Sequence, residues 1–583
     1  MLGARALVRV LAESGVRHVF GLPGDTGMGF YDALRDAQAE MTHVMTRDER
    51  SASFMADVYA RVSGRLGVCE GPSGGGATYI VPGVAEAHGS AIPLLCLTSD
   101  TPVSQHGRGV LTELDQEGLF RPVTKWTTRV NSPTTLAEAA RRAIRLAVSG
   151  RPGATHLSLP SDTLDGETPD ESVYGVPEYA AAPALRTRPD PDLVLRAADA
   201  LAAAARPVIV AGGGVLISRA WDELTALAET LNVPVATSIN GKGSIAETSR
   251  VAIGVVGGNG ARAYANACLA DADLVMFVGT RTESTTTCHW TLPASHPGPT
   301  VIHIDVEPWE LGNNYRTVAP VAGDAKLALA DLLTAIDRPD AVRTRNGERI
   351  DGLLAERDRY WADMERQAAA TERPIKPQRI VRALRELLDD DALIVADPGT
   401  PTPYLNAQYE LRRPGRTTVI PRAHGGLGYA IPGVVGAALA APGRRVVAMT
   451  TDGSFGMSVG ELETITRLNL PIVVVQCSNG SFGWIKELQH LYHGDRYFGV
   501  DFNPVDYAAI ARGFGFRARR ALDAEDVRPA IAEALADGGP FYLDVVTASP
   551  IAETPPVAAW TAAEAAKDRA EPAMAAVGGA HRP

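Results

Sequence analysis

The chain alternates between short apolar runs and stretches of helical periodicity. The apolar runs are rich in β-branched residues, as in HVFG at 18–21 and IVVVQC at 472–477, and Gly, Asp, Glu or Asn ends them or follows closely. Strands that are apolar on both faces and separated by helices are typical of parallel sheets covered on both sides. The pattern predicts an α/β protein of doubly wound parallel sheets, with ligands at the carboxyl ends of the strands.

This pattern recurs in separate segments, which we take as domains because 583 residues are too many for one core. The first segment is 1–170, the second is 190–340 and the third is 375–550, and a Pro-rich stretch at 179–192 links the first two. The Ala- and Pro-rich tail, 551–583, either closes over another part of the protein or frays, and its composition favours fraying.

The composition of the chain limits the kinds of partner that it can bind and the compartment in which it is expected. The net charge is -12, which argues against nucleic acid as a partner, although a local cleft can still attract small anions. Five scattered cysteines without CxxC spacing indicate free thiols in a reducing compartment and no zinc site. Because no signal peptide and no apolar run of about 18 residues occurs, we expect a cytoplasmic protein without a membrane span.

Polar residues follow two apolar runs in the stretch 450–484. Asp452 follows the run VVAM, and Asn479 follows the run IVVVQC, so both are expected at one edge of a parallel sheet. A carboxylate and an amide oxygen suit Mg²⁺, and Gly453 and the helix start near Ser454 suit a diphosphate. Two unrelated turns would also contain Asp and Asn, so the residues alone leave this alternative open.

A helix is predicted between these two turns. Ser458 and Glu461 have the spacing of a capping box, which predicts a helix start at this point. An apolar stripe at helical spacing follows, formed by Val459, Leu462, Ile465 and Leu468.

The interval between the two turns resembles the signature of thiamine diphosphate-dependent enzymes, which opens with GDG and closes with NN. On this resemblance Asp452, Asn479 and the carbonyl of Ser481 are the metal ligands. Thr451 replaces the first Gly of the signature and Ser478 replaces its first Asn. The likeness runs from GVRHVFGLPGD to PFYLDVV and is greatest to the acetolactate synthase and benzoylformate decarboxylase family. It implies a pyrimidine-binding domain, a central domain and a diphosphate-binding domain, in that order.

The resemblance also assigns the catalytic acid. The run RDER matches the family context of the Glu that hydrogen-bonds to the aminopyrimidine ring, which places Glu49 in register and puts Asp48 where the family has His. The residues alone favour the other interpretation, in which Glu49 is an acid in the first turn of a helix, stabilised by the helix dipole.

Further cofactor contacts follow from two glycine-containing runs. In RAHGGLGYAIPG, Leu427 falls on the residue that wedges the cofactor into its bent shape, and the carbonyl of Gly425 falls on the acceptor for its amino group. In ADPGT, Gly399 and Thr400 fall on the diphosphate loop. His424 stands where the synthases have a small residue, and it either shuttles protons as a catalytic residue or caps a turn.

The family pairs two chains at each active site. The resemblance therefore implies a homodimer or homotetramer, in which Glu49 of one chain meets the cofactor held by Asp452 and Asn479 of another. Some synthases also bind FAD in the central domain. Here the run GTRTESTTT departs from the family's flavin-contacting residues, and glycine clusters alone are weak evidence, so FAD is disfavoured.

The residues that correspond to the substrate pocket depart from the known branches of the family. Asp25 stands where the decarboxylase has Ser, and Thr112 falls in the place of a synthase Phe-Gln pair. Trp484 and Leu488 replace the synthases' Met and Trp. These departures favour a specialised carboligase that decarboxylates a short, pyruvate-like 2-oxo acid and joins the remaining fragment to a second carbonyl.

Three other functions stay open. Two are enzymatic: a simple 2-oxo acid decarboxylase and a C–C lyase of the 2-hydroxyacyl-CoA type. The third is a catalytically silent regulatory homologue, which the joint presence of Glu49, Asp452 and Asn479 disfavours.

Overall fold

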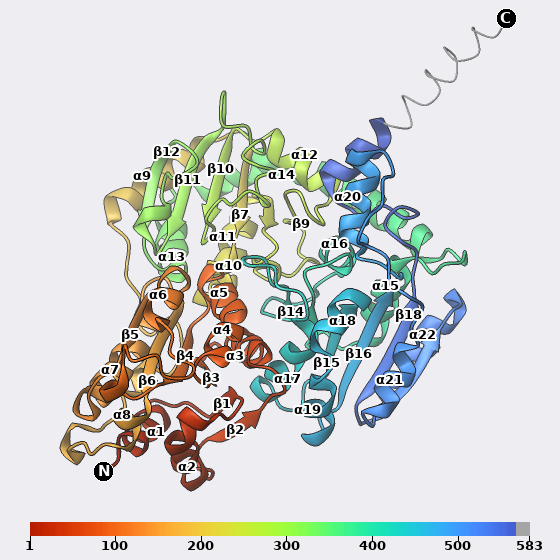
Figure 1. The fold of residues 1–583 in the computed structure, drawn as a ribbon. Helices are drawn as coiled ribbons and strands as arrows, with labels where there is room; N and C mark the ends of the chain where they lie inside the picture. The colour runs from red at the N-terminus through yellow and green to blue at the C-terminus, as the bar shows by residue number, and fades with distance from the viewer. Residues whose placement is uncertain (567–583) are drawn as a thin grey trace, which may run out of the picture.

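The computed structural model describes residues 1–566 of the chain, and these form three α/β units (Figure 1). In the described part each unit is built on a six-stranded sheet whose strands all pair in parallel. This confirms the predicted fold class, since strands buried on both faces must be connected by helices that cross over the sheet.

The N-terminal sheet has the strand order β2-β1-β3-β4-β6-β5. Its strands are β1 (His18–Gly21), β2 (Thr42–Met45), β3 (Gly67–Gly71), β4 (Leu94–Asp100), β5 (Trp126–Arg129) and β6 (Ala154–Pro160). Its helices are α1 (Gly3–Glu13), α2 (Met28–Asp36), α3 (Glu49–Ser63), α4 (Gly75–Tyr79), α5 (Val81–Gly89), α6 (Gln116–Phe120), α7 (Pro133–Val148) and α8 (Ser161–Asp165).

The central sheet has the order β12-β11-β10-β7-β8-β9. Its strands are β7 (Pro207–Ala211), β8 (Val235–Thr237), β9 (Ala252–Val255), β10 (Leu274–Val278), β11 (Thr300–Asp305) and β12 (Thr317–Ala322). Its helices are α9 (Pro191–Ala203), α10 (Gly213–Ser218), α11 (Trp221–Leu231), α12 (Ala263–Ala270), α13 (Ala325–Ala335) and the long α14 (Pro339–Ala368), which leads to the third unit.

The C-terminal sheet has the order β14-β13-β15-β16-β18-β17. Its strands are β13 (Leu393–Ala396), β14 (Thr418–Val419), β15 (Val446–Thr451), β16 (Ile472–Ser478), β17 (Arg517–Ala521) and β18 (Phe541–Val546). Its helices are α15 (Pro377–Leu387), α16 (Pro401–Gln408), α17 (Ala430–Ala440), α18 (Asp452–Ser458), α19 (Glu461–Arg467), α20 (Gly483–His493), α21 (Tyr507–Gly513) and α22 (Ala524–Ala536).

The capping box predicted at Ser458 is wrong. Ser458 is the last residue of α18, and its hydroxyl donates to the carbonyl of Ser454 at 3.5 Å. Glu461 begins α19, but its carboxylate accepts the N–H of Arg47 at 2.9 Å. A distant partner therefore replaces the local cap, and the segment between the two turns is a pair of short helices rather than one.

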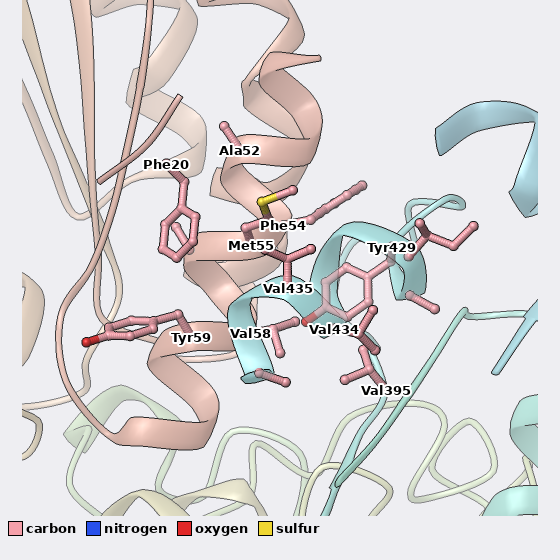
Figure 2. Packing of buried hydrophobic residues seen from close by; sticks show 14 of the residues in the cluster. Phe20, Ala52, Phe54, Met55, Val58, Tyr59, Val395, Tyr429, Val434 and Val435 are labelled. Atoms are coloured by element: carbon pink, nitrogen blue, oxygen red, sulfur yellow. The ribbon is translucent and has the colours of Figure 1, made fainter. Parts of the chain in front are cut away.

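The N-terminal and C-terminal units share one core where α3 packs on α17 (Figure 2). The rings of Phe54 and Tyr429 lie 5.1 Å apart between the two helices, and Val58 and Val434 are fully buried beside them. At Gly436 the backbones approach so closely that an added Cβ would lie 2.1 Å from the carbonyl oxygen of Met55. This glycine sets the distance between the two units.

The tail does not fray in its described part, so that expectation is wrong for residues 551–566. Trp560 is 4% exposed, and its ring lies 4.3 Å from that of Trp484 on α20. The N–H of Gly260 in the central unit donates to the carbonyl of Pro556 at 2.8 Å. The tail therefore joins the C-terminal unit to the central one, while residues 567–583 of the predicted tail lie outside the described part. No helix within residues 1–566 is long and apolar enough to cross a membrane.

Adding a methyl group at Gly436 tests the close approach of α17 to α3. Gly436→Ala should destabilise the protein by about 1–3 kcal/mol and lower its thermal unfolding temperature, because α17 must move away from α3 to admit the methyl group. Gly352→Ala in α14 is the matched control, since a Cβ there meets nothing within 4 Å and alanine favours a helix. An unfolding temperature of Gly436→Ala equal to or above that of the control would contradict this account.

Candidate active site

Asp452 joins the ends of two neighbouring strands. It follows β15, and its carboxylate accepts the N–H groups of Asn479 at 3.0 Å and Gly480 at 2.7 Å, beyond the end of β16. A third N–H, from Gly453, donates to it at 3.1 Å. Burial raises the pKa of Asp452 to about 6, against the effect of these donors. A cation would stabilise the charged form of this buried carboxylate.

Asn479 presents its amide next to that carboxylate. Its Oδ1 accepts the hydroxyl of Ser481 at 2.9 Å and the N–H of Ser481 at 3.2 Å, which fixes the side chain. Gly480 between them has a φ of +73°, and a Cβ there would meet nothing within 4 Å. Residues 1–566 hold no cluster of three or more His, Cys, Asp or Glu side chains that could bind a metal. A metal at this turn would therefore use one carboxylate with amide and backbone oxygens, a set that suits Mg²⁺.

The first turn of α18 fits a diphosphate. The hydroxyl of Ser454 is buried and has no hydrogen-bond partner among the described residues, which is a costly state for a polar group. The N–H of Ser454 donates weakly to the hydroxyl of Thr451, the N-cap residue, at 3.4 Å. Gly453 lies so close to Phe482 that a Cβ would be 2.7 Å from its ring. An anion at this helix start would satisfy the Ser454 hydroxyl.

Gly399 and Thr400 lie at the start of α16, across from this turn. Thr400 and Asn479 line one small cavity, so the structure brings the two predicted phosphate-binding runs together. Asp397, which the sequence pattern did not single out, lies just before this loop, and its backbone carbonyl accepts the N–H of Gly399 at 2.8 Å. Its carboxylate accepts the hydroxyl of Thr450 at 2.7 Å and the N–H of Tyr429 at 2.7 Å. Burial raises the pKa of Asp397 to about 6.

The turn at Gly425 is held by a residue of the N-terminal unit. The N–H groups of His424 and Gly425 donate to Glu86 on α5, at 2.7 Å and 3.3 Å. Burial alone would raise the pKa of Glu86, but Arg61 and these backbone donors lower it overall. Gly425 has a φ of +73° with open space beside it, and Leu427 next to it is half-buried. The ring of His424 is exposed and makes no hydrogen bond with residues 1–566, so it caps no turn in this part of the chain.

Glu49 is the first residue of α3 and is 7% exposed. Asp48, at the position of the family His, caps the helix by accepting the N–H of Arg50 at 2.8 Å. A Cβ on Gly76 would lie 3.1 Å from Glu49 Oε1, so two glycines, Gly71 and Gly76, leave room for this carboxyl group. Burial raises the pKa of Glu49, and the charges of Asp48 and Glu70 add to the effect. A solvated acid in a helix first turn would not show this burial.

A second buried acid, Glu70, lies beside Glu49. It is in β3, and its carboxylate accepts the hydroxyl of Tyr31 and lies 3.2 Å from His43 Nε2. Tyr31 and His43 also contact one another, with 3.1 Å between the hydroxyl and Nε2. Glu70 was not predicted, although a charged residue within a buried apolar strand is a sequence signal that could have identified it.

The predicted pocket residues fall into two groups. Asp25 is exposed and accepts the N–H of Thr26 at 2.9 Å, and Thr112 lies 2.7 Å from the hydroxyl of Ser73, near the ends of β1, β3 and β4. Trp484 and Leu488 instead lie on α20 and pack with Trp560 of the tail. Figure 1 shows α6, which follows Thr112, and α20 on opposite sides of the molecule. One chain therefore does not bring the four residues together.

The packing of α3 within one chain is relevant to the active site in which Glu49 acts. We predicted that Glu49 meets the cofactor held by a partner chain, yet α3 packs on α17 beside the Gly425 turn of the same chain. A Cβ on Gly426 would lie 3.1 Å from the ring of Phe54 on α3. The surfaces next to Glu49 and to the Gly425 turn thus meet within one chain. That Glu49 acts in the site of a partner chain stays a prediction.

A cavity lies at the carboxyl ends of β7, β10 and β11 of the central unit, and residues of the other two units, such as Arg151 and Arg422, also line it. Gly213, Gly214, Gly279 and Asp305 line it, in the place where doubly wound sheets bind nucleotides. The prediction that FAD is disfavoured here stays untested, and the absorbance spectrum of the purified protein would decide it.

Comparison with known proteins places this geometry in a family. Residues 1–119 match the N-terminal TPP binding domain of thiamine pyrophosphate enzymes, residues 194–332 match their central domain, and residues 397–545 match their C-terminal TPP binding domain. The three units of the fold thus correspond to the three domains of that family.

Similarity extends along nearly the whole chain. A probable acetolactate synthase large subunit of Methanocaldococcus jannaschii is 34% identical over 94% of this chain and 92% of its own length. The acetolactate synthase large subunit of Parasynechococcus marenigrum is 32% identical, over 93% and 87%. The acetolactate synthase isozyme 3 large subunit of Escherichia coli K12 is 31% identical, over 91% and 92%. The chain therefore belongs to the thiamine pyrophosphate enzymes, within the group that contains the acetolactate synthase large subunits.

Proposed function

We propose that the protein is a cytoplasmic, thiamine diphosphate- and Mg²⁺-dependent carboligase of the acetolactate synthase type. It decarboxylates a short 2-oxo acid such as pyruvate and joins the remaining fragment to a second carbonyl compound. The observation that carries this proposal is the pairing of Asp452 with Asn479 beside the buried, unpartnered hydroxyl of Ser454. The acetolactate synthase names of its relatives support the reaction type.

The C-terminal unit would hold the cofactor. Asp452, Asn479 and the carbonyl of Ser481 would bind Mg²⁺, and the Ser454 hydroxyl with the backbone of Gly453 would bind the diphosphate. Gly399 and Thr400 would contact the same diphosphate from the start of α16, where Thr400 lines a cavity together with Asn479. When bound, thiamine diphosphate supplies a carbon nucleophile that adds to 2-oxo acids and stabilises the charge left by loss of CO₂.

Side chains and backbone groups of the protein would donate and accept protons and hydrogen bonds at the bound cofactor. Burial raises the pKa of the Glu49 carboxyl group, so it keeps its proton to a higher pH than an exposed glutamate does, and it could donate a hydrogen bond to a nitrogen of the cofactor's pyrimidine ring. The backbone carbonyl of Gly425 would accept a hydrogen bond from the amino group of the cofactor's pyrimidine ring. Leu427 would set the tilt of that ring. The exposed imidazole of His424 would be the candidate to shuttle protons at this turn.

We further propose that the working enzyme is a homodimer or a larger homo-oligomer. One chain leaves Asp25 and Thr112 apart from Trp484 and Leu488, so a second chain is needed to assemble one pocket from both groups. An interface between copies would also exclude water from the substrate pocket.

Product analysis tests the reaction. With thiamine diphosphate and Mg²⁺ supplied, pyruvate alone or with an added aldehyde should give a coupled hydroxyketone and one CO₂ for each product formed. Mass spectrometry and CO₂ release measure both. Acetaldehyde with no coupled product would instead indicate a decarboxylase, and turnover confined to a 2-hydroxyacyl thioester would indicate a lyase.

Mixing two inactive variants tests where Glu49 acts. Glu49→Gln and Asp452→Asn should each lower turnover by about 10²-fold or more, with Glu49→Gln still binding the cofactor. If each site takes Glu49 from one chain and Asp452 from the other, unfolding and refolding the mixture together should restore activity, since one site of each mixed dimer is intact. Sites built within one chain would leave the mixture as inactive as its components.

Removing Glu70 should change the titration of Glu49. Glu70→Gln deletes a neighbouring negative charge that raises the pKa of Glu49, so Glu49 should lose its proton at a lower pH. We expect the limb of the kcat/KM profile that depends on Glu49 to move to lower pH. Glu463→Gln, on the exposed side of α19, is the control for loss of one carboxylate. An unmoved profile in Glu70→Gln would contradict a role for Glu70 in tuning Glu49.

A further inference from the structure

A third cavity, distinct from the one at the candidate active site and next to the one at the strand ends of the central sheet, lies where the three units meet. Its volume is about 220 Å³, enough for several waters or a small polyatomic ion. It is bounded by the C-terminal end of α3, by the end of α10 and the start of α11, and by two loops of the C-terminal unit. Its lining includes Arg61, Arg219, Arg416 and Arg444, and no Asp or Glu of the described residues lines it.

One of these four arginines, Arg61, forms ion pairs with carboxylates that lie outside the cavity. Arg61 donates from Nε to Asp57 at 2.8 Å and from Nη2 to Glu86 at 3.0 Å, and all three side chains are almost completely buried. Its charge is therefore matched by carboxylates that do not reach the cavity, and its remaining effect on the cavity is small.

The other three arginines have no carboxylate within ion-pair distance in residues 1–566. Arg219 donates to the carbonyl of Ser63 at 3.4 Å, and Arg444 donates from Nε to the carbonyl of Asp391 at 2.6 Å. Burial lowers the pKa of Arg444, and the Asp391 carboxylate opposes this from a distance but forms no ion pair with it. Both guanidinium groups thus face neutral backbone acceptors rather than carboxylates.

Arg416 is the least compensated of the three. It makes no hydrogen bond or ion pair with any described residue, although it lines the cavity. Burial and the nearby charge of Arg61 lower its pKa to about 10, so it still carries a positive charge at neutral pH. Gathering three such charges around one partly enclosed space is unfavourable unless an anion enters it.

We infer that this cavity is a binding site for a small oxyanion, either inorganic phosphate or the carboxylate of a small organic acid. Arginine presents a planar fork of donors that matches both kinds of oxyanion. Arg219 belongs to the central unit, Arg416 and Arg444 belong to the C-terminal unit, and the backbone of residues 60–64 belongs to the N-terminal unit. A bound oxyanion therefore links all three units and stabilises their packing. This inference does not depend on the proposed reaction.

Calorimetry on the full-length protein tests it, with thiamine diphosphate and Mg²⁺ present in excess to occupy the diphosphate site. Inorganic phosphate and acetate, an unreactive carboxylate, are titrated separately at constant ionic strength set with chloride. We expect saturable binding of one anion per chain by at least one of the two probes, and a rise in thermal unfolding temperature with the same probe. The probe that binds identifies the source, and binding by neither at 10-fold above physiological concentrations, on the order of 10 mM, overturns the inference.

Substitutions locate the bound anion. Arg416→Gln should weaken binding about 10-fold or more, since it removes one charged donor from a partly enclosed site. Arg413→Gln is the matched control, because Arg413 is exposed on the same loop and does not line the cavity. Arg219→Gln, from another unit, gives a second test that does not depend on the folding of the first variant. Equal affinity in the control and in both cavity variants would place the anion elsewhere and overturn the inference.

Discussion

The carboxylate of Asp452 is the contact on which the candidate site depends. It accepts backbone N–H groups from a turn 27 residues further along the chain, and so fixes the ends of β15 and β16 relative to one another. These donors stabilise its charge only in part, because burial still raises its pKa to about 6. A rigid, incompletely compensated carboxylate next to an amide oxygen is a site prepared for a hard cation.

Buried carboxylates also fix the contact between the N-terminal and C-terminal units. Buried acids of one unit hold the backbone or side chains of the other: Glu86 accepts the N–H groups of the Gly425 turn, and Asp57 accepts the hydroxyl of Tyr429. Arg61 lies between these two acids, forms an ion pair with each, and so offsets part of their charge. Breaking one member of such a network leaves a buried charge unpaired, so the network fixes how the two units dock. The position of the Gly425 turn therefore depends on residues that never touch the cofactor.

Much of this architecture follows from the sequence, and the reasons are local. Central strands such as β16 are continuous apolar runs, and the polar residues that end them meet because neighbouring parallel strands share an edge. Edge strands carry no such signal: β17 has the sequence RARRA and β14 has two residues, so neither was predicted. The long α14 was missed as well, because it is polar on most of its surface and buries few residues.

The residues that the sequence did not reveal are those whose partners lie far away along the chain. Glu86 contacts a turn more than 330 residues away, and Trp560 is a single aromatic in a low-complexity tail that finds Trp484 only after folding. Glu70 was visible as a charge within an apolar strand, but its relation to Glu49 requires the folded sheet.

The most direct measurement of the central claim is calorimetric titration of the metal-supplied protein with thiamine diphosphate. The account predicts uptake of one cofactor per chain that requires Mg²⁺ and is lost in Asp452→Asn, while Asp501→Asn, an exposed acid beyond the same turn, binds normally. Absence of uptake by the unaltered protein, or equal uptake by Asp452→Asn, would contradict it.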